Sequence, residues 1–277
     1  MTFLRRNRIG SLFLLLATGL GCVSTVLAQP GGAPGGPPRT PRAAALIDIT
    51  GQWVAVVNED WRWRMITAPV GDTSSLPTNA EARKVAAAWN LEKDRAEGNL
   101  CKAFGAPGLI RQPTRIRVSW QDDKTMKMEF DAGKQVRLLN FNAGAPPAGL
   151  SLQGFSSASW YRQRTSRGVL GANGGTPGGS LHVRTTQLSP GYLRPNGVPY
   201  SDKTTMQEYI TTFTLPGNAG SWLIVTTIIE DPVYLTQKLV LSTQFRKETN
   251  NANWNPRDCD ILPPRVVRPP TVPGPFG

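Results

Sequence analysis

Histidine is nearly absent from this chain of 277 residues, which contains only His182. One imidazole cannot build a metal site that needs two histidine ligands. A Ser-His-Asp triad would have to use this residue, and the Gly-x-Ser-x-Gly sequence of a nucleophile elbow does not precede it. Leu181 and Val183 flank His182 in an alternating stretch, where a solvent-facing or hydrogen-bonded role is commoner than catalysis. The sequence therefore predicts no metal ion, and we expect no cofactor because no haem, flavin or phosphate-loop motif is visible.

Acidic residues are also scarce, with 19 Asp and Glu against 31 Lys and Arg and a net charge of +12. The basic residues are scattered along predicted strands and form no dense run, which disfavours a nucleic-acid partner. In an exported protein, a charge of this sign is more typical of solubility and of peripheral contact with anionic envelope surfaces.

Charge is missing from residues 9–28, which follow three arginines among the first eight positions. This stretch has an apolar core and ends in Val26-Leu27-Ala28, the three-part pattern of a secretory signal peptide. A membrane anchor needs about 20 apolar residues, but three glycines and the cleavable end favour removal. The sequence therefore predicts a signal peptide over residues 1–28, a mature chain without a transmembrane segment, and a periplasmic or secreted location.

Cysteine occurs three times, and removal of the leader would take away Cys22 and leave Cys101 and Cys259. An even pair in an oxidising compartment indicates a disulfide. The long loop that it closes would stabilise the fold by about 4–5 kcal/mol, less any strain. Two buried free thiols are the alternative, which the compartment disfavours.

Glycine and proline concentrate at both ends of the mature chain. Residues 29–44 include Gly-Gly-Ala-Pro-Gly-Gly-Pro-Pro, and residues 263–277 form a proline-rich tail. Such compositions bury little apolar area and act as linkers. The sequence predicts one folded domain between them, over residues 45–262.

Most of this domain alternates between apolar and polar residues, the period of a β-strand. Residues 115–120 and 126–130 alternate on either side of a turn-like Gln-Asp-Asp-Lys, which predicts a hairpin. Residues 61–66 predict another strand, whereas residues 79–89 predict a helix capped by Asn79. About nine or ten strands predict a mainly β fold, an antiparallel meander closed into a barrel of about 8–10 strands with a short helical insertion. Such a barrel can hold one small ligand.

Two short sequences resemble the lipocalin (calycin) pattern. The first predicted strand begins with Gly51-Gln52-Trp53, and the last ends in Phe245-Arg246-Lys247. In that family a basic side chain of the final strand covers a first-strand tryptophan. The resemblance therefore implies that Arg246 stacks on Trp53 and closes the barrel bottom, with about 0.5–2 kcal/mol from the cation–π contact. A Cys101–Cys259 bond fits this pattern, because lipocalins often tie the C-terminal segment to the barrel wall.

The resemblance covers the barrel outline and leaves out the helix and insertions between residues 73 and 108. Three further segments, residues 59–64, 197–201 and 230–236, are similar to those of an uncharacterised group of exported bacterial proteins. That group has no activity to carry over.

Glu208 is the acid that attracts most interest. On the predicted strand over residues 204–214 it shares a face with Met206, and Tyr209 lies on the other face. If the Met206 face points inward, Glu208 lies in an apolar cavity with a raised pKa, which suits proton transfer. If the Tyr209 face points inward, Glu208 is an ordinary solvated residue. A buried ion pair between Glu208 and Arg137 that holds the barrel together is a third interpretation.

Aromatic and guanidinium groups gather in the sequence Asp-Trp-Arg-Trp-Arg over residues 60–64. One interpretation is an aromatic wall of a ligand mouth, with Arg64 holding a carboxylate, and the other is a core strand with a solvated edge. Tyrosines in loops near proline and glycine could rim the same mouth. The predicted ligand-binding residues are Trp61, Trp63, Arg64, Arg137, Tyr192, Tyr200 and Tyr209.

Three hypotheses for function follow. The first is a periplasmic module that binds a small apolar or amphipathic ligand, favoured by the barrel outline, eight tryptophans and the absence of a recognisable catalytic set. The second is an enzyme on the same scaffold, a cyclase, isomerase or lyase that uses Glu208 as a buried carboxylate. The third is a structural protein of the cell envelope that uses its proline-rich ends as tethers.

Overall fold

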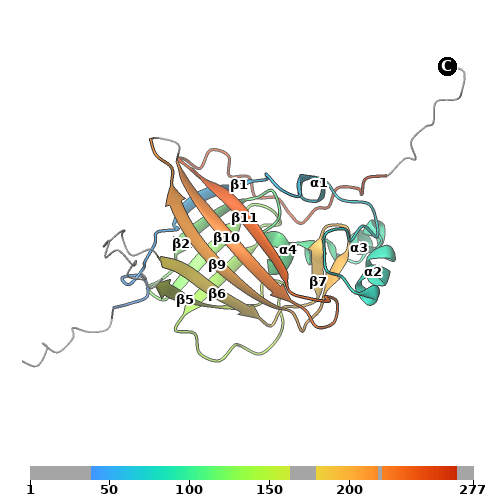
Figure 1. The fold of residues 1–277 in the computed structure, drawn as a ribbon, viewed down its shortest axis with the longest axis horizontal. Helices are drawn as coiled ribbons and strands as arrows, with labels where there is room; N and C mark the ends of the chain where they lie inside the picture. The colour runs from blue at the N-terminus through green and yellow to red at the C-terminus, as the bar shows by residue number, and fades with distance from the viewer. Residues whose placement is uncertain (1–38, 163–178, 218–219, 267–277) are drawn as a thin grey trace, which may run out of the picture. The chain divides into compact units, whose positions relative to one another are not determined.

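The computed structural model describes residues 39–162, 179–217 and 220–266 (Figure 1). The predicted signal peptide over residues 1–28 lies outside these residues. The same holds for most of the predicted linker and for residues 267–277 of the predicted tail. Among the described residues, no helix is long and apolar enough to cross a membrane.

The alternating sequences form strands, as the hairpin at the centre of the domain illustrates. Strands β2 (Arg115–Trp120) and β3 (Thr125–Phe130) pair antiparallel, with Val118 opposite Met128. Their apolar residues point to the buried face and their polar residues to the outer face, as a period of two requires. The predicted hairpin is confirmed.

Nine strands close into one barrel in the order β1-β11-β10-β9-β6-β5-β4-β3-β2, and β2 pairs back to β1 (Figure 1). The predicted mainly β fold with a closed barrel and few helices is confirmed. The remaining barrel strands are β1 (Gly51–Val56), β4 (Val136–Phe141), β5 (Phe155–Arg162), β6 (Gly179–Thr186), β9 (Thr205–Thr214), β10 (Ser221–Glu230) and β11 (Leu239–Glu248).

One strand pair departs from the predicted antiparallel meander, because β4 and β5 run parallel. Residues 142–154 join them. Parallel neighbours need a connection of about a dozen residues or more, because the chain must run from the end of β4 back to the opposite end of the sheet, where β5 begins. A separate hairpin, β7 (Gly191–Arg194) with β8 (Val198–Tyr200), lies between β6 and β9 in the chain.

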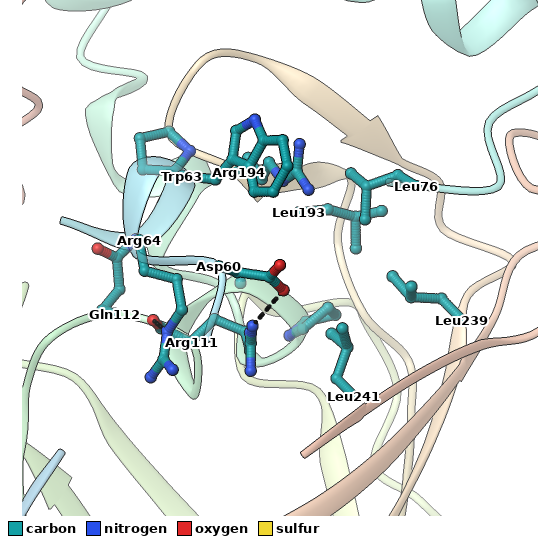
Figure 2. A pocket seen from close by; sticks show the side chains of 13 residues that line it. Asp60, Trp63, Arg64, Leu76, Arg111, Gln112, Leu193, Arg194, Leu239 and Leu241 are labelled. Carbon is teal, nitrogen blue, oxygen red and sulfur yellow. Dashed lines mark hydrogen bonds and ion pairs between the residues drawn. The ribbon is translucent and has the colours of Figure 1, made fainter. Parts of the chain in front are cut away.

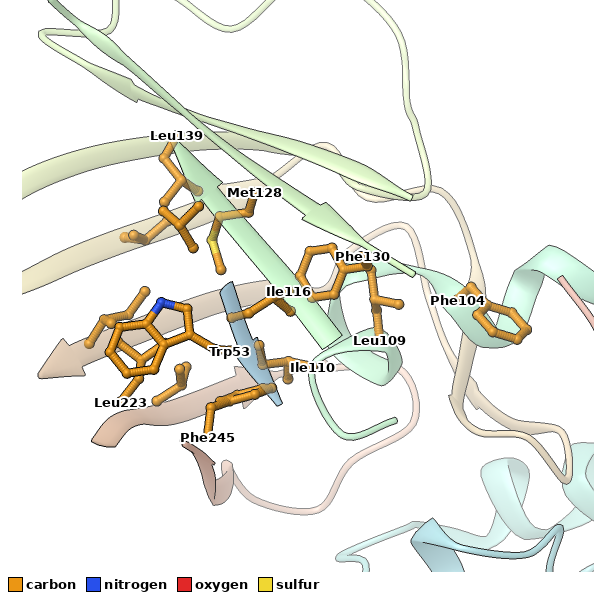
Figure 3. Packing of buried hydrophobic residues seen from close by; sticks show 14 of the residues in the cluster. Trp53, Phe104, Leu109, Ile110, Ile116, Met128, Phe130, Leu139, Leu223 and Phe245 are labelled. Carbon is orange, nitrogen blue, oxygen red and sulfur yellow. The ribbon is translucent and has the colours of Figure 1, made fainter. Parts of the chain in front are cut away.

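Side chains fill the barrel interior (Figure 3). Trp53, Met128 and Phe245 are at most 1% exposed, and they meet across the barrel with residues of facing strands. Packing of this kind excludes water from the interior and supplies most of the stability of a β-barrel. The interior therefore differs from the ligand-holding cavity that a lipocalin-like barrel suggests.

The end of the barrel near Trp53 is covered differently from the expectation. Trp53 lies opposite Lys247 in the β1–β11 pairing, and the Lys247 Nζ atom is 5.2 Å from the centre of the indole ring. Arg246 lies opposite Val54 and is exposed. The prediction that Arg246 stacks on Trp53 is wrong by one residue, because successive side chains of a strand point to opposite faces.

Short helices gather at one end of the barrel, beside β7 (Figure 1). The predicted capped helix is confirmed, since the Asn79 side chain accepts a hydrogen bond of 2.9 Å from the Ala82 amide, as an N-cap does. The helices are α1 (Trp61–Arg64), α2 (Ala80–Ala87), α3 (Leu91–Ala96), the 3-10 helix η1 (Leu100–Phe104) and α4 (Ala106–Leu109).

The strand predicted over residues 61–66 is wrong, because this stretch begins with helix α1. Asp60 precedes it in the left-handed conformation, with φ of 53°, which turns the chain sharply after β1. The helical turn buries Arg64 and leaves Trp61 62% exposed. Residues 61–64 alternate between tryptophan and arginine, a pattern that a strand also shows. Contacts with residues distant in sequence determine that this stretch forms a helix.

A disulfide between Cys101 and Cys259, with a Cα–Cα distance of 5.1 Å, joins η1 to the segment after β11. The predicted pairing is confirmed. The same segment hydrogen-bonds to the barrel, where the Arg257 amide donates to the Asp131 carbonyl over 2.8 Å. The residues after the last strand are therefore held at two points, by η1 through the disulfide and by the turn after β3 through the hydrogen bond.

Candidate functional site

Glu208 lies inside the barrel and is 0% exposed, on the same face of β9 as the buried Met206. Its two carboxylate oxygens accept hydrogen bonds of 3.0 and 2.6 Å from the two terminal nitrogens of Arg137, which is 1% exposed. One of these nitrogens also lies 3.3 Å from the Thr185 hydroxyl and 3.4 Å from the Ser156 hydroxyl. The geometry is that of the ion pair foreseen as one interpretation.

This pair has the features of a structural element. Both oxygens of the carboxylate face the guanidinium in a bidentate arrangement, which is the strongest geometry for such a contact. The two residues come from β4 and β9, strands on different sides of β5 and β6 in the barrel order. Both carboxylate oxygens are engaged and packed apolar side chains enclose the pair, although the Arg137 Nε atom has no partner among the described residues. The arrangement therefore supports a role in holding strands together over a role in proton transfer.

The predicted ligand-binding tyrosines are dispersed. Tyr209 lies on the outer face of β9, where its ring stacks on His182 at a centroid distance of 4.6 Å. Tyr192 donates a hydrogen bond of 3.2 Å to Asp94, and burial together with this carboxylate raises its pKa. Tyr200 is 1% exposed in the core beside β7, and burial raises the pKa of its hydroxyl. Among the described residues, neither these tyrosines nor Trp61 line the pocket that contains Trp63 and Arg64.

Trp63 and Arg64 are the two predicted site residues that line a common pocket (Figure 2). This pocket, which we call the helical-end pocket, lies outside the barrel interior, between α1, α4, β7 and the start of β11. In Figure 2 leucine side chains form one side, and Arg64, Arg111 and Gln112 form the other. The lining residues are Asp60, Trp63, Arg64, Leu76, Pro107, Gly108, Arg111, Gln112, Leu193, Arg194, Pro195, Leu239 and Leu241.

Arg111 holds the polar side together. One of its terminal nitrogens donates to Glu59 over 2.8 Å and to the Ser242 carbonyl over 2.7 Å, and the other donates to Asp60 over 2.9 Å. Arg64 approaches the same carboxylate, since its Nη1 atom lies 2.8 Å from Glu59 Oε1. Its Nε atom donates to the Arg111 carbonyl over 3.0 Å. Two guanidinium groups therefore share one glutamate.

Trp63 connects a third arginine to this cluster. The guanidinium carbon of Arg194 lies 4.7 Å from the centre of the indole ring, and that of Arg62 lies 4.0 Å from it. Both distances are within the range of a cation–π contact. The indole nitrogen donates to Asp72 over 3.0 Å, which fixes the ring in the pocket wall.

Three buried guanidinium nitrogens lack hydrogen-bond partners among the described residues: Nη2 of Arg64 and Nη1 of Arg194 at this pocket, and Nε of Arg137 in the barrel interior. Arg64 and Arg194 are 7% and 8% exposed. Burial, and next the charge of Arg111, lower the pKa of Arg64 to about 10. Burial also lowers the pKa of Arg194 to about 10, against the opposing charge of Asp72. The pocket therefore holds cationic donors that the protein itself does not fully compensate.

Two wider hollows adjoin the helical-end pocket. A groove of about 760 Å³ shares Arg64, Gln112 and Pro195 with it and continues along residues 252–262. A hollow of about 460 Å³ shares Asp60, Arg111 and Leu241 with it. The free volume of the helical-end pocket itself is about 30 Å³. The arginines thus lie where three concave regions meet.

The reasoning from sequence missed Arg111 and Arg194. Each follows an apolar pair, Leu109-Ile110 and Tyr192-Leu193 respectively, and a cation embedded in apolar sequence is the signal that was available. Within residues 39–162, 179–217 and 220–266, no three His, Cys, Asp or Glu side chains are grouped so as to hold a metal ion.

Comparisons with known proteins give no relative, because no family model, no curated protein and no solved structure matches the chain. The closed nine-stranded barrel is compatible with a lipocalin-like fold. Membership of the calycins, or of the exported bacterial group, stays a prediction from sequence.

Proposed function

We propose that this protein binds a small amphipathic molecule in the helical-end pocket. The observation that carries the proposal is the two-sided lining, in which leucines face guanidinium groups across one cavity. Ligand pockets combine an apolar wall with a few polar groups that fix orientation. The two adjoining hollows supply room for the parts of a ligand that the small central cavity does not hold.

The proposal retains the binding module expected from sequence and moves its site from the barrel interior to the outside of one barrel end. The packed interior supports this relocation, because its apolar side chains and its single ion pair already fill it. The barrel then serves as a rigid scaffold that holds α1, β7 and β11 in position.

We also propose that binding takes place outside the cytoplasm, in the periplasm or after secretion. The signal-peptide pattern of residues 1–28 supports this location. The Cys101–Cys259 disulfide supports it as well, because such bonds persist in oxidising compartments.

Calorimetric titration tests the binding proposal. The probes are four ten-carbon amphiphiles that differ only in their head group, namely decanol, decanoate, decyl phosphate and decylamine. We expect at least one of them to bind, and we expect Leu241→Gln to weaken that binding about tenfold by removing apolar contact. Leu138→Gln is the matched control, since Leu138 is 40% exposed on the outer face of β4 and lines none of the three hollows.

Failure of all four probes to bind would overturn the proposed function. Equal binding by the Leu241→Gln and Leu138→Gln variants would place the ligand elsewhere on the molecule and would also contradict the proposal. Thermal unfolding of each variant without ligand verifies that the protein is folded before titration.

A further inference from the structure

We propose that the helical-end pocket recognises a carboxylate head group through the guanidinium groups of Arg64 and Arg194. This inference rests on the proposed function and names the class of ligand, a carboxylic acid with an apolar tail. Two observations carry it: the guanidinium nitrogens of Arg64 and Arg194 that have no partner among the described residues, and the placement of the leucines.

The carboxylates around the pocket are already engaged. Glu59 accepts hydrogen bonds from both Arg64 and Arg111. Asp60 accepts from Arg111, and Asp72 accepts from the Trp63 indole and from the Ser74 amide. No acid remains for the two unpaired guanidinium nitrogens.

A buried donor without an acceptor is costly, and at the wall of a cavity such a donor is a candidate for binding a ligand. Arg64 and Arg194 are each more than nine-tenths buried, and both line the same cavity. Their free donors come from different elements, α1 and β7. An anion inside the cavity would supply the acceptors that these donors lack.

Two free donors suit an anion with two oxygens, because Arg64 and Arg194 each leave one terminal nitrogen without a partner among the described residues. A phosphate group presents more oxygens and a tetrahedral shape. A planar carboxylate also suits the planar fork of a guanidinium.

The leucines indicate where the rest of the ligand lies. Leu239 and Leu241 line the cavity from β11, and Leu241 also lines the adjoining hollow of about 460 Å³. An apolar tail that leaves the arginines therefore passes along β11 into this hollow. The arrangement orients the ligand with its acid at the helical end.

Head-group selectivity in calorimetric titration tests the inference. We expect decanoate to bind the wild-type protein at least tenfold more tightly than decanol, because charge-assisted hydrogen bonds are worth more than neutral ones. We expect decylamine to bind most weakly, since its charge meets the arginines. Decyl phosphate is expected to bind less tightly than decanoate, because its tetrahedral head group has more oxygens than the two free donors can serve.

Arg194→Gln is expected to weaken the binding of decanoate about tenfold and to leave decanol within twofold. Arg64→Gln is expected to give the same pattern. Arg194→Gln is the preferred test, because Arg64 also donates hydrogen bonds within the protein, to Glu59 and to the Arg111 carbonyl. The control is Arg246→Gln, which removes the same charge from an exposed position on β11 and should leave both affinities unchanged.

The outcomes separate the two proposals. Equal affinity for decanoate and decanol would overturn the carboxylate inference while leaving the binding function in place, and would mean that water serves the unpaired donors. Tighter binding of decyl phosphate than of decanoate would overturn the choice of head group. Absence of any binding would overturn both.

Discussion

The barrel interior and the helical-end pocket both contain contacts between arginine and glutamate, but they arrange them differently. In the interior both carboxylate oxygens of Glu208 accept hydrogen bonds from Arg137, whose Nε atom has no partner among the described residues. In the pocket Arg64 and Arg111 share Glu59, and Arg194 keeps one terminal nitrogen without a partner among the described residues. The interior pair is enclosed by packed side chains, whereas the pocket arginines border a cavity.

The largest predicted effect tests the matched pair. Glu208→Gln leaves the Arg137 cation buried with a weakened partner, and we expect it to lower the free energy of unfolding by about 3–5 kcal/mol. Urea denaturation measures this. Glu129→Gln is the control, because Glu129 is half-buried on β3 beside Lys127 and should change stability by less than about 1 kcal/mol.

The double variant Arg137→Met with Glu208→Leu sharpens the same test. Replacing both charges by apolar side chains removes the desolvation cost, so we expect most of the lost stability to return. A Glu208→Gln protein as stable as the wild type would contradict a structural role for the pair. It would revive the interpretation of Glu208 as an acid that acts on a ligand.

The second prediction concerns the unmatched region. Arg194→Met removes a buried cation whose charge the protein does not fully compensate, so we expect the free energy of unfolding to change by no more than about 1 kcal/mol, with either sign. The same urea measurement on Arg137→Met should show a loss of about 3–5 kcal/mol. Equal losses in the two variants would erase the distinction between the two regions.

The smallest predicted effect depends on pH. Burial by itself would raise the pKa of the Asp72 carboxyl, but hydrogen bonds from Ser74 and Trp63 and the charge of Arg194 outweigh it and lower this pKa below its ordinary value of 3.8. A depressed carboxyl pKa stabilises the folded state above the unfolded pKa, and this contribution is lost as the pH falls through the folded pKa.

Asp72→Asn should therefore be less stable than the wild type at pH 7, and the difference should shrink below about pH 4. Unfolding by urea at a series of pH values measures it. Asp123→Asn, at an exposed turn, should show no such trend. A difference that stays constant down to pH 2 would mean that the Asp72 charge does not stabilise the pocket wall.

The alternation of apolar residues was sufficient to predict the closed barrel, because burial on one face of a strand depends on local sequence. The capped helix was predictable for the same reason, since Asn79 bonds to an amide only three residues away. Lys247, in place of Arg246, shows the limit of this approach. A shift of one residue along a strand moves a side chain to the opposite face of the sheet. Only the pairing of β1 with β11 in the structure shows that Lys247, and not Arg246, lies opposite Trp53.

The site was less predictable than the fold. Arg111 and Arg194 lie far apart in the chain, and the hydrogen bonds that bring Arg64 to Arg111 replace the strand that Trp61–Arg64 suggests by itself. The sequence predicted Tyr209 as a ligand-binding residue. Because Glu208 points into the barrel, the next residue, Tyr209, lies on the outer face beside His182. Contacts between residues distant in sequence determine such positions, so the local sequence pattern does not predict them.

Closure of the barrel between the first and last strands has a consequence for how the protein is made. Gln52 pairs with Glu248, so the domain completes its sheet only after nearly all of it has been synthesised. Until then β1 and β10 each present an open edge, which can pair with another chain. Folds dominated by such distant contacts form slowly. The Cys101–Cys259 bond then joins residues 158 apart in sequence and secures the segment that borders the groove of about 760 Å³. A chain cut short before β11 would therefore lack its closing strand and the two leucines with which that strand lines the helical-end pocket, and it would keep two open sheet edges.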